Sequence, residues 1–185
     1  MRTFMLLMVL AACRPEKVAN PHDHVASRTN PEVQQDVGAK APDSSPVQAR
    51  DGSTVELAHA WADNRVVLVF YMGHWCPECQ HQLAALNDRQ KDFADKHTTV
   101  IAVSTDSPQD AGALKDKMGL TFDVYSDTQL QSIAKWGVAD YDTNIAKPST
   151  FVIQKGGAIT FKKIGQSTTD RPTVDDILAQ LPDSM

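Results

Sequence analysis

Cysteine is scarce in this chain: only Cys13, Cys76 and Cys79 occur among 185 residues. A second Cys-x-x-Cys pair and a His-x-x-x-His pair are both missing, and with them the usual ligand set of a structural zinc site. Basic blocks are missing as well and the formal net charge is −5, so we expect no nucleic-acid partner. No apolar run reaches the roughly 18 residues of a membrane span. The remaining composition, 42% hydrophobic and 22% charged, is that of a globular domain with a substantial core.

The first 13 residues have the layout of an export signal. Arg2 is followed by a short apolar run, which predicts a signal peptide over residues 1–12. The run ends in Leu-Ala-Ala-Cys, which resembles the bacterial lipobox and implies cleavage before Cys13 and a lipid on its sulfur. Arg14 stands where an aspartate would favour retention in the inner membrane. We therefore expect a lipid anchor in the cell envelope and a domain that faces the periplasm, with the outer membrane as the favoured location.

Residues 13–36 are polar, contain several prolines and show no periodicity, which is typical of a flexible tether. A single folded domain is expected over residues 37–182. With Cys13 used for the lipid, only Cys76 and Cys79 are left in this domain. A compartment outside the cytoplasm allows these two to form a disulfide.

Apolar runs and helical periodicities alternate along the domain, which predicts an α/β fold with a central mixed sheet flanked by helices. Residues 65–71 are a valine-rich apolar run of the kind found in a strand buried on both faces. Ser107 and Pro108 mark the start of one helix, and Gly119 marks its end. The other expected elements are a hairpin around 50–53, a helical pattern from 77 to 93, strands at 98–105 and 122–127, a helix at 128–137, a hairpin at 149–165 and a helix at 173–181.

The segment Cys76-Pro77-Glu78-Cys79 lies where the buried strand gives way to the helical pattern. Pro77 suits the first helical turn and so places Cys76 at the cap, where free backbone N–H groups and the helix dipole favour a thiolate. Cys79 lies one turn further on, within the distance that a disulfide bridges. The spacing therefore predicts a redox-active dithiol with Cys76 and Cys79 as its catalytic residues.

Two other uses of the pair remain open at this point. A passive disulfide is one, although closing so short a loop constrains the unfolded chain little. A metal site is the other, with His74 and His81 on either side of the pair as candidate ligands and a copper carrier as the corresponding function. Apart from that alternative, the sequence predicts neither a metal nor a cofactor.

The stretch from residue 37 to residue 181 resembles the redoxin group of the thioredoxin-fold superfamily, the alkyl hydroperoxide reductase and thiol-specific antioxidant family. The matching pieces are, in order, GAKAPD, VVLVFYMGHWCPEC, VIAVSTDSP, LTFDVYSD and KPSTFVIQKGGAI. The resemblance implies a thioredoxin-like fold and a peroxiredoxin-like oxidoreductase, which reduces hydroperoxides with electrons from an external dithiol. A periplasmic protein-disulfide reductase is the alternative within the same superfamily.

The two activities assign the site residues differently. In a thioredoxin-like reductase, WCPEC is the WCxxC motif: Cys76 attacks a protein disulfide, Cys79 resolves the mixed disulfide, and Pro148 in KPST is the cis-proline that faces the motif. In a peroxiredoxin, Cys79 takes the peroxidatic position and Cys76 replaces the family's threonine. Lys147 then stands near the position of an arginine that polarises peroxide, but it lacks the bidentate fork of a guanidinium. Trp75 is expected as an aromatic cover over the pair.

Overall fold

The computed structural model describes residues 35–182. The predicted signal peptide, Cys13 and all but the end of the predicted tether lie outside this part of the chain. Within residues 35–182, no helix combines the length and the apolar character that crossing a membrane requires.

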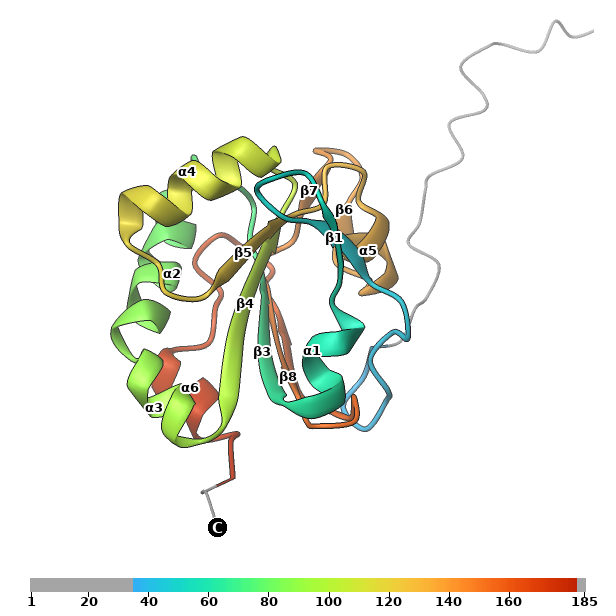
Figure 1. Cartoon of the computed structure of the whole chain (residues 1–185), viewed down its shortest axis with the longest axis vertical. Helices are drawn as coiled ribbons and strands as arrows, with labels where there is room; N and C mark the ends of the chain where they lie inside the picture. The colour runs from blue at the N-terminus through green and yellow to red at the C-terminus, as the bar shows by residue number, and fades with distance from the viewer. Residues whose placement is uncertain (1–34, 183–185) are drawn as a thin grey trace, which may run out of the picture.

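Strands and helices alternate along the chain, as the apolar pattern predicts (Figure 1). Their order is β1 (Pro46–Gln48), β2 (Thr54–Glu56), α1 (Ala58–Asp63), β3 (Arg65–Phe70), α2 (Pro77–Asp88), α3 (Gln90–Asp95), β4 (Thr98–Ser104), α4 (Pro108–Met118), β5 (Asp123–Ser126), α5 (Gln131–Lys135), β6 (Ala139–Asp140), β7 (Ile145–Ala146), β8 (Ser149–Ile153), β9 (Ile159–Ile164) and α6 (Val174–Leu178). The small pair β6-β7 forms a sheet of its own.

Seven strands form the central sheet in the order β2-β1-β5-β4-β3-β8-β9. β3 is parallel to β4 and antiparallel to β8, and β4 continues the parallel part to β5. The antiparallel hairpins β1-β2 and β8-β9 form the two edges. The fold is therefore α/β and thioredoxin-like, with a central mixed sheet flanked by helices, as the sequence predicts.

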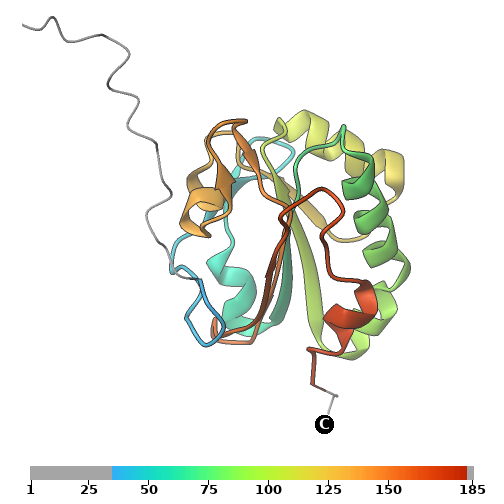
Figure 2. The same cartoon turned by 180° about the vertical axis from the view of Figure 1, so that it is seen from behind.

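The helices form one layer on each face of the sheet. α2, α3, α4 and α6 cover one face, and α1 and α5 cover the other (Figures 1 and 2). Successive side chains of β3 alternate between the two cores, so that Val67 and Val69 pack with α2 while Phe70 packs on the opposite side. Both cysteines belong to the core on the α2 face. The opposite core contains an aromatic cluster formed by Trp61, Phe70, Trp136 and Phe151.

Element boundaries differ from the sequence prediction where tertiary contacts decide them. The helix expected over 128–137 forms only as α5, because the carboxylate of Asp127 accepts hydrogen bonds of 2.8–2.9 Å from the backbone N–H groups of Gln131, Ser132 and Ile133. The helical pattern that starts at residue 77 is interrupted at Arg89 and continues as α3. α1 and the β6-β7 pair were not predicted, since both are too short to show a periodicity.

Candidate active site

The cysteine pair lies at the carboxyl end of β3, where the chain passes through residues 71–76 into α2. Cys76 is the N-cap of α2, and its sulfur accepts a hydrogen bond of 3.2 Å from the backbone N–H of Cys79. Pro77 occupies the first helical turn, where no backbone N–H is needed. Both cysteines are free thiols. The Cys76 sulfur therefore contacts the backbone of Cys79, which lies one helical turn further along the chain.

The two thiols are closed off from solvent, with exposed fractions of 2% for Cys76 and 0% for Cys79. Burial raises the pKa of the Cys79 thiol to about 11, and the hydrogen bond with Cys76 is the second largest cause of this rise. The backbone N–H of Met72 and the guanidinium of Arg171 act in the opposite direction on the same pKa. Cys79 is thus mostly protonated near neutral pH, and its thiolate depends on the few donors that reach it.

Arg171, which the sequence did not point to, contacts both sulfurs. Its Nη2 lies 3.2 Å from the Sγ of Cys79 and 4.0 Å from the Sγ of Cys76. The residue lies in the loop between β9 and α6, far from the pair along the chain. A single arginine in a polar loop carries no periodic or spacing signal, so only the path of the chain after β9 reveals this contact.

Lys147 and Pro148 form the link between β7 and β8. The peptide bond before Pro148 is trans, so the prediction of a cis-proline is wrong. β7 runs almost directly into β8, and the trans form, which is the lower in energy, keeps this link extended. Lys147 is exposed, and within residues 35–182 its ammonium makes no hydrogen bond to either sulfur. It lines a cleft of about 400 Å³ that also borders Met72.

Trp75 lies at the outer corner of the loop before α2. The backbone N–H of Cys76 donates to the carbonyl of Gly73 at 3.1 Å, which closes a turn over His74 and Trp75. The indole packs against Gly73, whose φ is 157°, and a Cβ there would meet the indole nitrogen at 2.5 Å. Trp75 is still 55% exposed, so it lies at the surface of the loop and not in the core.

A buried carboxylate holds the same turn in place. Asp106, which follows β4, accepts a hydrogen bond of 2.8 Å from the backbone N–H of His74, and its other oxygen lies 2.8 Å from the Nδ1 of that residue. The hydroxyl of Ser104 donates to the carboxylate at 2.8 Å. Both oxygens of Asp106 are therefore satisfied, and the loop that leads into Cys76 is fixed to the end of β4.

Tyr71 is fully buried below this loop, and within residues 35–182 its hydroxyl has no hydrogen-bond partner. Its polar neighbours are Ser104, Asp106 and Cys79. Burial raises the pKa of Tyr71 far above its ordinary range, and the charge of Asp106 acts in the same direction. Tyr71 therefore stays neutral and adds no charge beside Cys79.

No group of three or more His, Cys, Asp or Glu side chains in the described part of the chain is arranged to hold a metal ion. His74 is paired with Asp106, and His81 lies on the exposed side of α2, 3.8 Å from Glu78. The two histidines that were candidate copper ligands thus have other partners.

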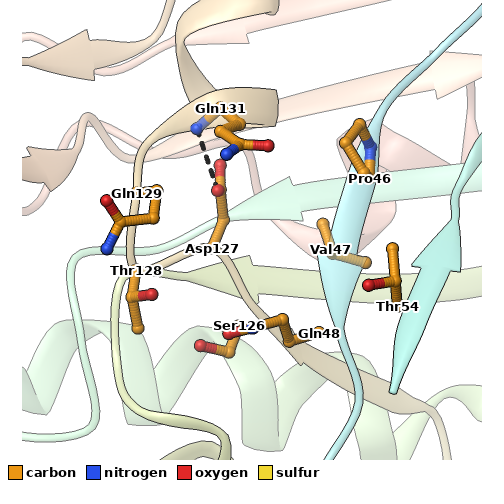
Figure 3. Close-up of a pocket in the computed structure, with 9 residues that line it drawn as sticks. All are labelled: Pro46, Val47, Gln48, Thr54, Ser126, Asp127, Thr128, Gln129 and Gln131. Atoms are coloured by element: carbon orange, nitrogen blue, oxygen red, sulfur yellow. Dashed lines mark hydrogen bonds between the residues drawn. The ribbon is translucent and has the colours of Figure 1, made fainter. Parts of the chain in front are cut away.

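A second hollow, of about 160 Å³, lies between β1 and the start of α5 (Figure 3). Asp127 is its acidic residue, and its carboxylate is directed to the N–H of Gln131 and the two residues that follow. Ser126 donates its hydroxyl to the backbone carbonyl of Asp106. Asp127 and Ser126 therefore hold the fold together at this hollow. Both cysteines of residues 35–182 lie at the start of α2.

A buried dithiol at the start of a helix, on a thioredoxin-like sheet, defines a thiol-dependent oxidoreductase. Residues 37–162 match the model of the AhpC/TSA family, and the chain belongs to that family. A protein of Mycobacterium tuberculosis (strain H37Rv) that is named as a peroxiredoxin is 30% identical over 138 residues, which cover 71% of this chain and 87% of the relative. Peroxiredoxin Bcp of Bacillus subtilis is 29% identical over 67% of this chain and 82% of its own length. The thiol-disulfide oxidoreductase ResA of Geobacillus thermodenitrificans is 28% identical over 98% of this chain and 92% of its own.

Solved structures show the same fold. The peroxidoxin BcpB of Mycobacterium tuberculosis superimposes with a TM-score of 0.69 at 22% identity, over 78% of this chain and 94% of that one. Together, family and relatives identify peroxiredoxin-like, thiol-based peroxide reduction as the activity of this chain. Such an enzyme needs a peroxide or thiol substrate and a source of electrons.

Proposed function

We propose that the chain reduces hydroperoxides with Cys79 as the attacking sulfur and Cys76 as the resolving one. The observation that carries this proposal is the hydrogen bond of 3.2 Å from the Cys79 N–H to the Cys76 sulfur. The Cys76 sulfur lies in the same helical turn as Cys79, three residues before it, where the resemblance to peroxiredoxins expects a threonine. A sulfenic acid on Cys79 then meets its partner without any rearrangement of the loop.

The reaction has three steps. The Cys79 thiolate attacks one oxygen of ROOH, the O–O bond breaks, and the leaving alkoxide takes a proton to become ROH, which leaves a sulfenic acid on Cys79. The Cys76 thiolate then attacks the Cys79 sulfur, so that an S–S bond forms and hydroxide leaves and becomes water. An external dithiol finally reduces this disulfide by two exchanges, is oxidised to its own disulfide, and restores both thiols.

The cysteine assignment is tested by replacing the resolving sulfur. In Cys76→Thr, a hydroxyl can still bind peroxide beside Cys79, so we expect one round of oxidation and accumulation of a sulfenic acid at Cys79. The measurement is single-turnover peroxide consumption, with a sulfenic-acid trap located by mass spectrometry. Cys79→Ser, the matched control, should consume no peroxide. An inert Cys76→Thr protein beside a reactive Cys79→Ser protein would overturn the assignment.

A protein-disulfide reductase is the second candidate, and one observation favours it. Cys76 caps α2, where an N–H donor and the helix dipole stabilise a thiolate, as the attack on a protein disulfide requires. The likeness to ResA along nearly the whole chain agrees with this activity. This candidate predicts that Cys79→Ser attacks a model protein disulfide through Cys76 and stops at a mixed disulfide, with one substrate thiol released, because the resolving thiol is missing.

The anchor is a separate proposal, supported by the Leu-Ala-Ala-Cys sequence that ends at Cys13. A lipid on Cys13 would keep the domain at the membrane of the cell envelope, facing the periplasm, with residues 13–36 as its tether. Cys13→Ala should remove fatty-acid labelling and release the protein from membranes, while thiol activity remains. Labelling that persists in this variant would contradict the proposal.

A further inference from the structure

A methionine lies at the border between the buried cysteine pair and an open cleft. Met72 belongs to the loop that runs from the end of β3 to Cys76. Its side chain is partly buried and packs against the core that contains both cysteines. The same residue lines the cleft of about 400 Å³ next to Lys147 and Pro148. A molecule that enters this cleft therefore meets Met72.

The cleft adjoins the cysteine pair through two of its lining residues. The backbone N–H of Met72 acts against the rise in the Cys79 pKa that burial causes. Thr168 accepts a hydrogen bond of 2.7 Å at its carbonyl from Arg171, which contacts both sulfurs. The other apolar residues of the lining are Ile145, Ala146, Pro148 and Ile164. A cleft of this volume with an apolar lining has room for a small organic molecule, such as an organic hydroperoxide.

Met118 offers a comparison within the same protein, because it is the other methionine of residues 35–182. It is the last residue of α4, and it too is partly buried against the core that contains the cysteines. The next residue, Gly119, accepts a hydrogen bond of 3.2 Å at its carbonyl from the side chain of Asn87, near the end of α2. Met118 thus lies beside the end of α2, whereas the cysteines lie at its start.

The thioether of a methionine reacts with hydroperoxides without losing a proton first. Its sulfur attacks the terminal oxygen of ROOH, the O–O bond breaks, and the proton of that oxygen passes to the leaving alkoxide. A sulfoxide and ROH are formed, so that the sulfur loses two electrons and the peroxide gains them. Cys79 has to be deprotonated before it reacts, and burial raises its pKa to about 11. Met72 therefore competes for peroxide where the thiolate of Cys79 is scarce.

We propose that Met72 is a site of oxidation by hydroperoxides and that its sulfoxide slows the reactions of Cys79, so that excess peroxide limits the enzyme. A sulfoxide is polar, and the core against which Met72 packs offers it an apolar surrounding, so the oxidised side chain is driven out of its place. Movement of Met72 also withdraws its backbone N–H from the Cys79 thiol. The limit on the enzyme rests on the proposed function, whereas the oxidation of Met72 and its effect on Cys79 do not.

The site of oxidation is tested in the full chain carrying Cys76→Ser and Cys79→Ser, in which no thiol of the pair consumes peroxide. The protein is exposed to cumene hydroperoxide, and peptide mass spectrometry follows the sulfoxide at Met72 and at Met118 in time. We expect Met72 to be oxidised about threefold or more faster than Met118, because the cleft brings the reagent to its sulfur. Oxidation of Met118 at the same rate or faster would overturn the inference.

The effect on Cys79 is tested with a side chain that imitates the polarity of the sulfoxide. In the full chain carrying Cys76→Ser, Met72→Gln adds a polar group of similar length, Met72→Leu keeps the position apolar, and Met118→Gln is the matched control. We expect Met72→Gln to slow Cys79 alkylation by iodoacetamide about threefold or more relative to Met72→Leu, with Met118→Gln equal to the parent protein. Thermal unfolding reports whether each protein folds. Equal alkylation rates in folded Met72→Gln and Met72→Leu proteins would overturn the effect on Cys79.

The limit on the enzyme is tested in proteins that keep both cysteines. Peroxide consumption with dithiothreitol is measured before and after exposure to excess cumene hydroperoxide, and each protein is compared with its own untreated sample. The parent protein and Met118→Leu should lose a larger fraction of their rate than Met72→Leu, which forms no sulfoxide at this position. Equal losses in all three would contradict the limit. If Met72 is oxidised first and Met72→Gln slows alkylation, but the untreated parent consumes no peroxide, then the proposed function fails and the oxidation site stands.

Discussion

Two helices of this protein, α2 and α4, begin with the same type of N-terminal cap but have different roles. α2 starts at Cys76 and α4 at Ser107, each followed by a proline in the first turn. In each case the cap side chain accepts the backbone N–H three residues further on, at 3.2 Å from Cys79 and at 3.1 Å from Asp110. By local structure alone, the two helix starts are nearly equivalent.

Their surroundings differ. The start of α2 lies beneath the loop that carries Arg171, and both of its cysteines are buried. At the start of α4, Asp110 is exposed and exchanges hydrogen bonds with Ser107 at the protein surface. The comparison shows that a capped helix start is no reactive site in itself. Burial of the nucleophile and a cation delivered from elsewhere make the difference.

The largest expected difference between the two helix starts appears when the third residue of each helix is replaced. Cys79→Ser should lower peroxide consumption by about 10³-fold or more, because the attacking atom is lost. Asp110→Asn should leave this rate within about twofold, since nothing at the start of α4 reaches the sulfurs. Steady-state peroxide consumption with an external dithiol measures both. Equal losses of peroxide consumption in the two variants would contradict the view that only the start of α2 is reactive.

The pH dependence sharpens the same comparison. With the Cys79 pKa raised to about 11, the thiolate fraction increases about tenfold per pH unit from pH 6 to pH 9, and the single-turnover oxidation rate should follow it. A thiol placed by Ser107→Cys at the solvent-exposed start of α4, with Cys76 and Cys79 changed to serine, should titrate well below pH 11 because burial is absent. Alkylation profiles measure both thiols, and coinciding midpoints would contradict the role of burial.

Asp106 links the two helix starts, because it immediately precedes Ser107 and binds His74 in the loop before Cys76. Asp106→Ala leaves the His74 N–H and the Ser104 hydroxyl without their acceptor, so the free energy of unfolding should fall by about 1–3 kcal/mol. Peroxide oxidation should slow as well, since the loop loses its support. Urea unfolding and single-turnover kinetics test this, and a stability equal to that of the parent protein would show that the loop is held by other contacts.

The smallest effect is expected from the cap of α4. Ser107→Ala removes the acceptor for the Asp110 N–H and should lower the free energy of unfolding by about 1 kcal/mol, with peroxide reduction unchanged. Urea unfolding with a parallel activity assay checks both parts. A clear loss of activity would mean that the two helix starts are coupled.

Much of this architecture could be predicted from the sequence, because strands and helix starts are set by residues that are close together in the chain. The valine-rich run of β3 indicated a central strand, and the cap and proline residues marked the starts of α2 and α4. The trans bond before Pro148 was not foreseen, because it depends on how β7 and β8 pack together. Trp75 lies outside the core, and its role as a cover over the pair stays a prediction. The family resemblance pointed to Lys147 as the cation near the pair, whereas in the structure the guanidinium of Arg171, from another loop, contacts the sulfurs.

The sequence by itself determined the α/β order, the place of the dithiol at a helix start and its spacing of one turn. These follow from periodicity, capping and chain geometry within a few residues. Only the tertiary structure decided how deeply the thiols are buried and which cation reaches them. The burial raises the pKa of Cys79. Desolvation and charge contacts depend on segments that meet in space, and Cys79 and Arg171, which are 92 positions apart in the sequence, share no local signal of that meeting.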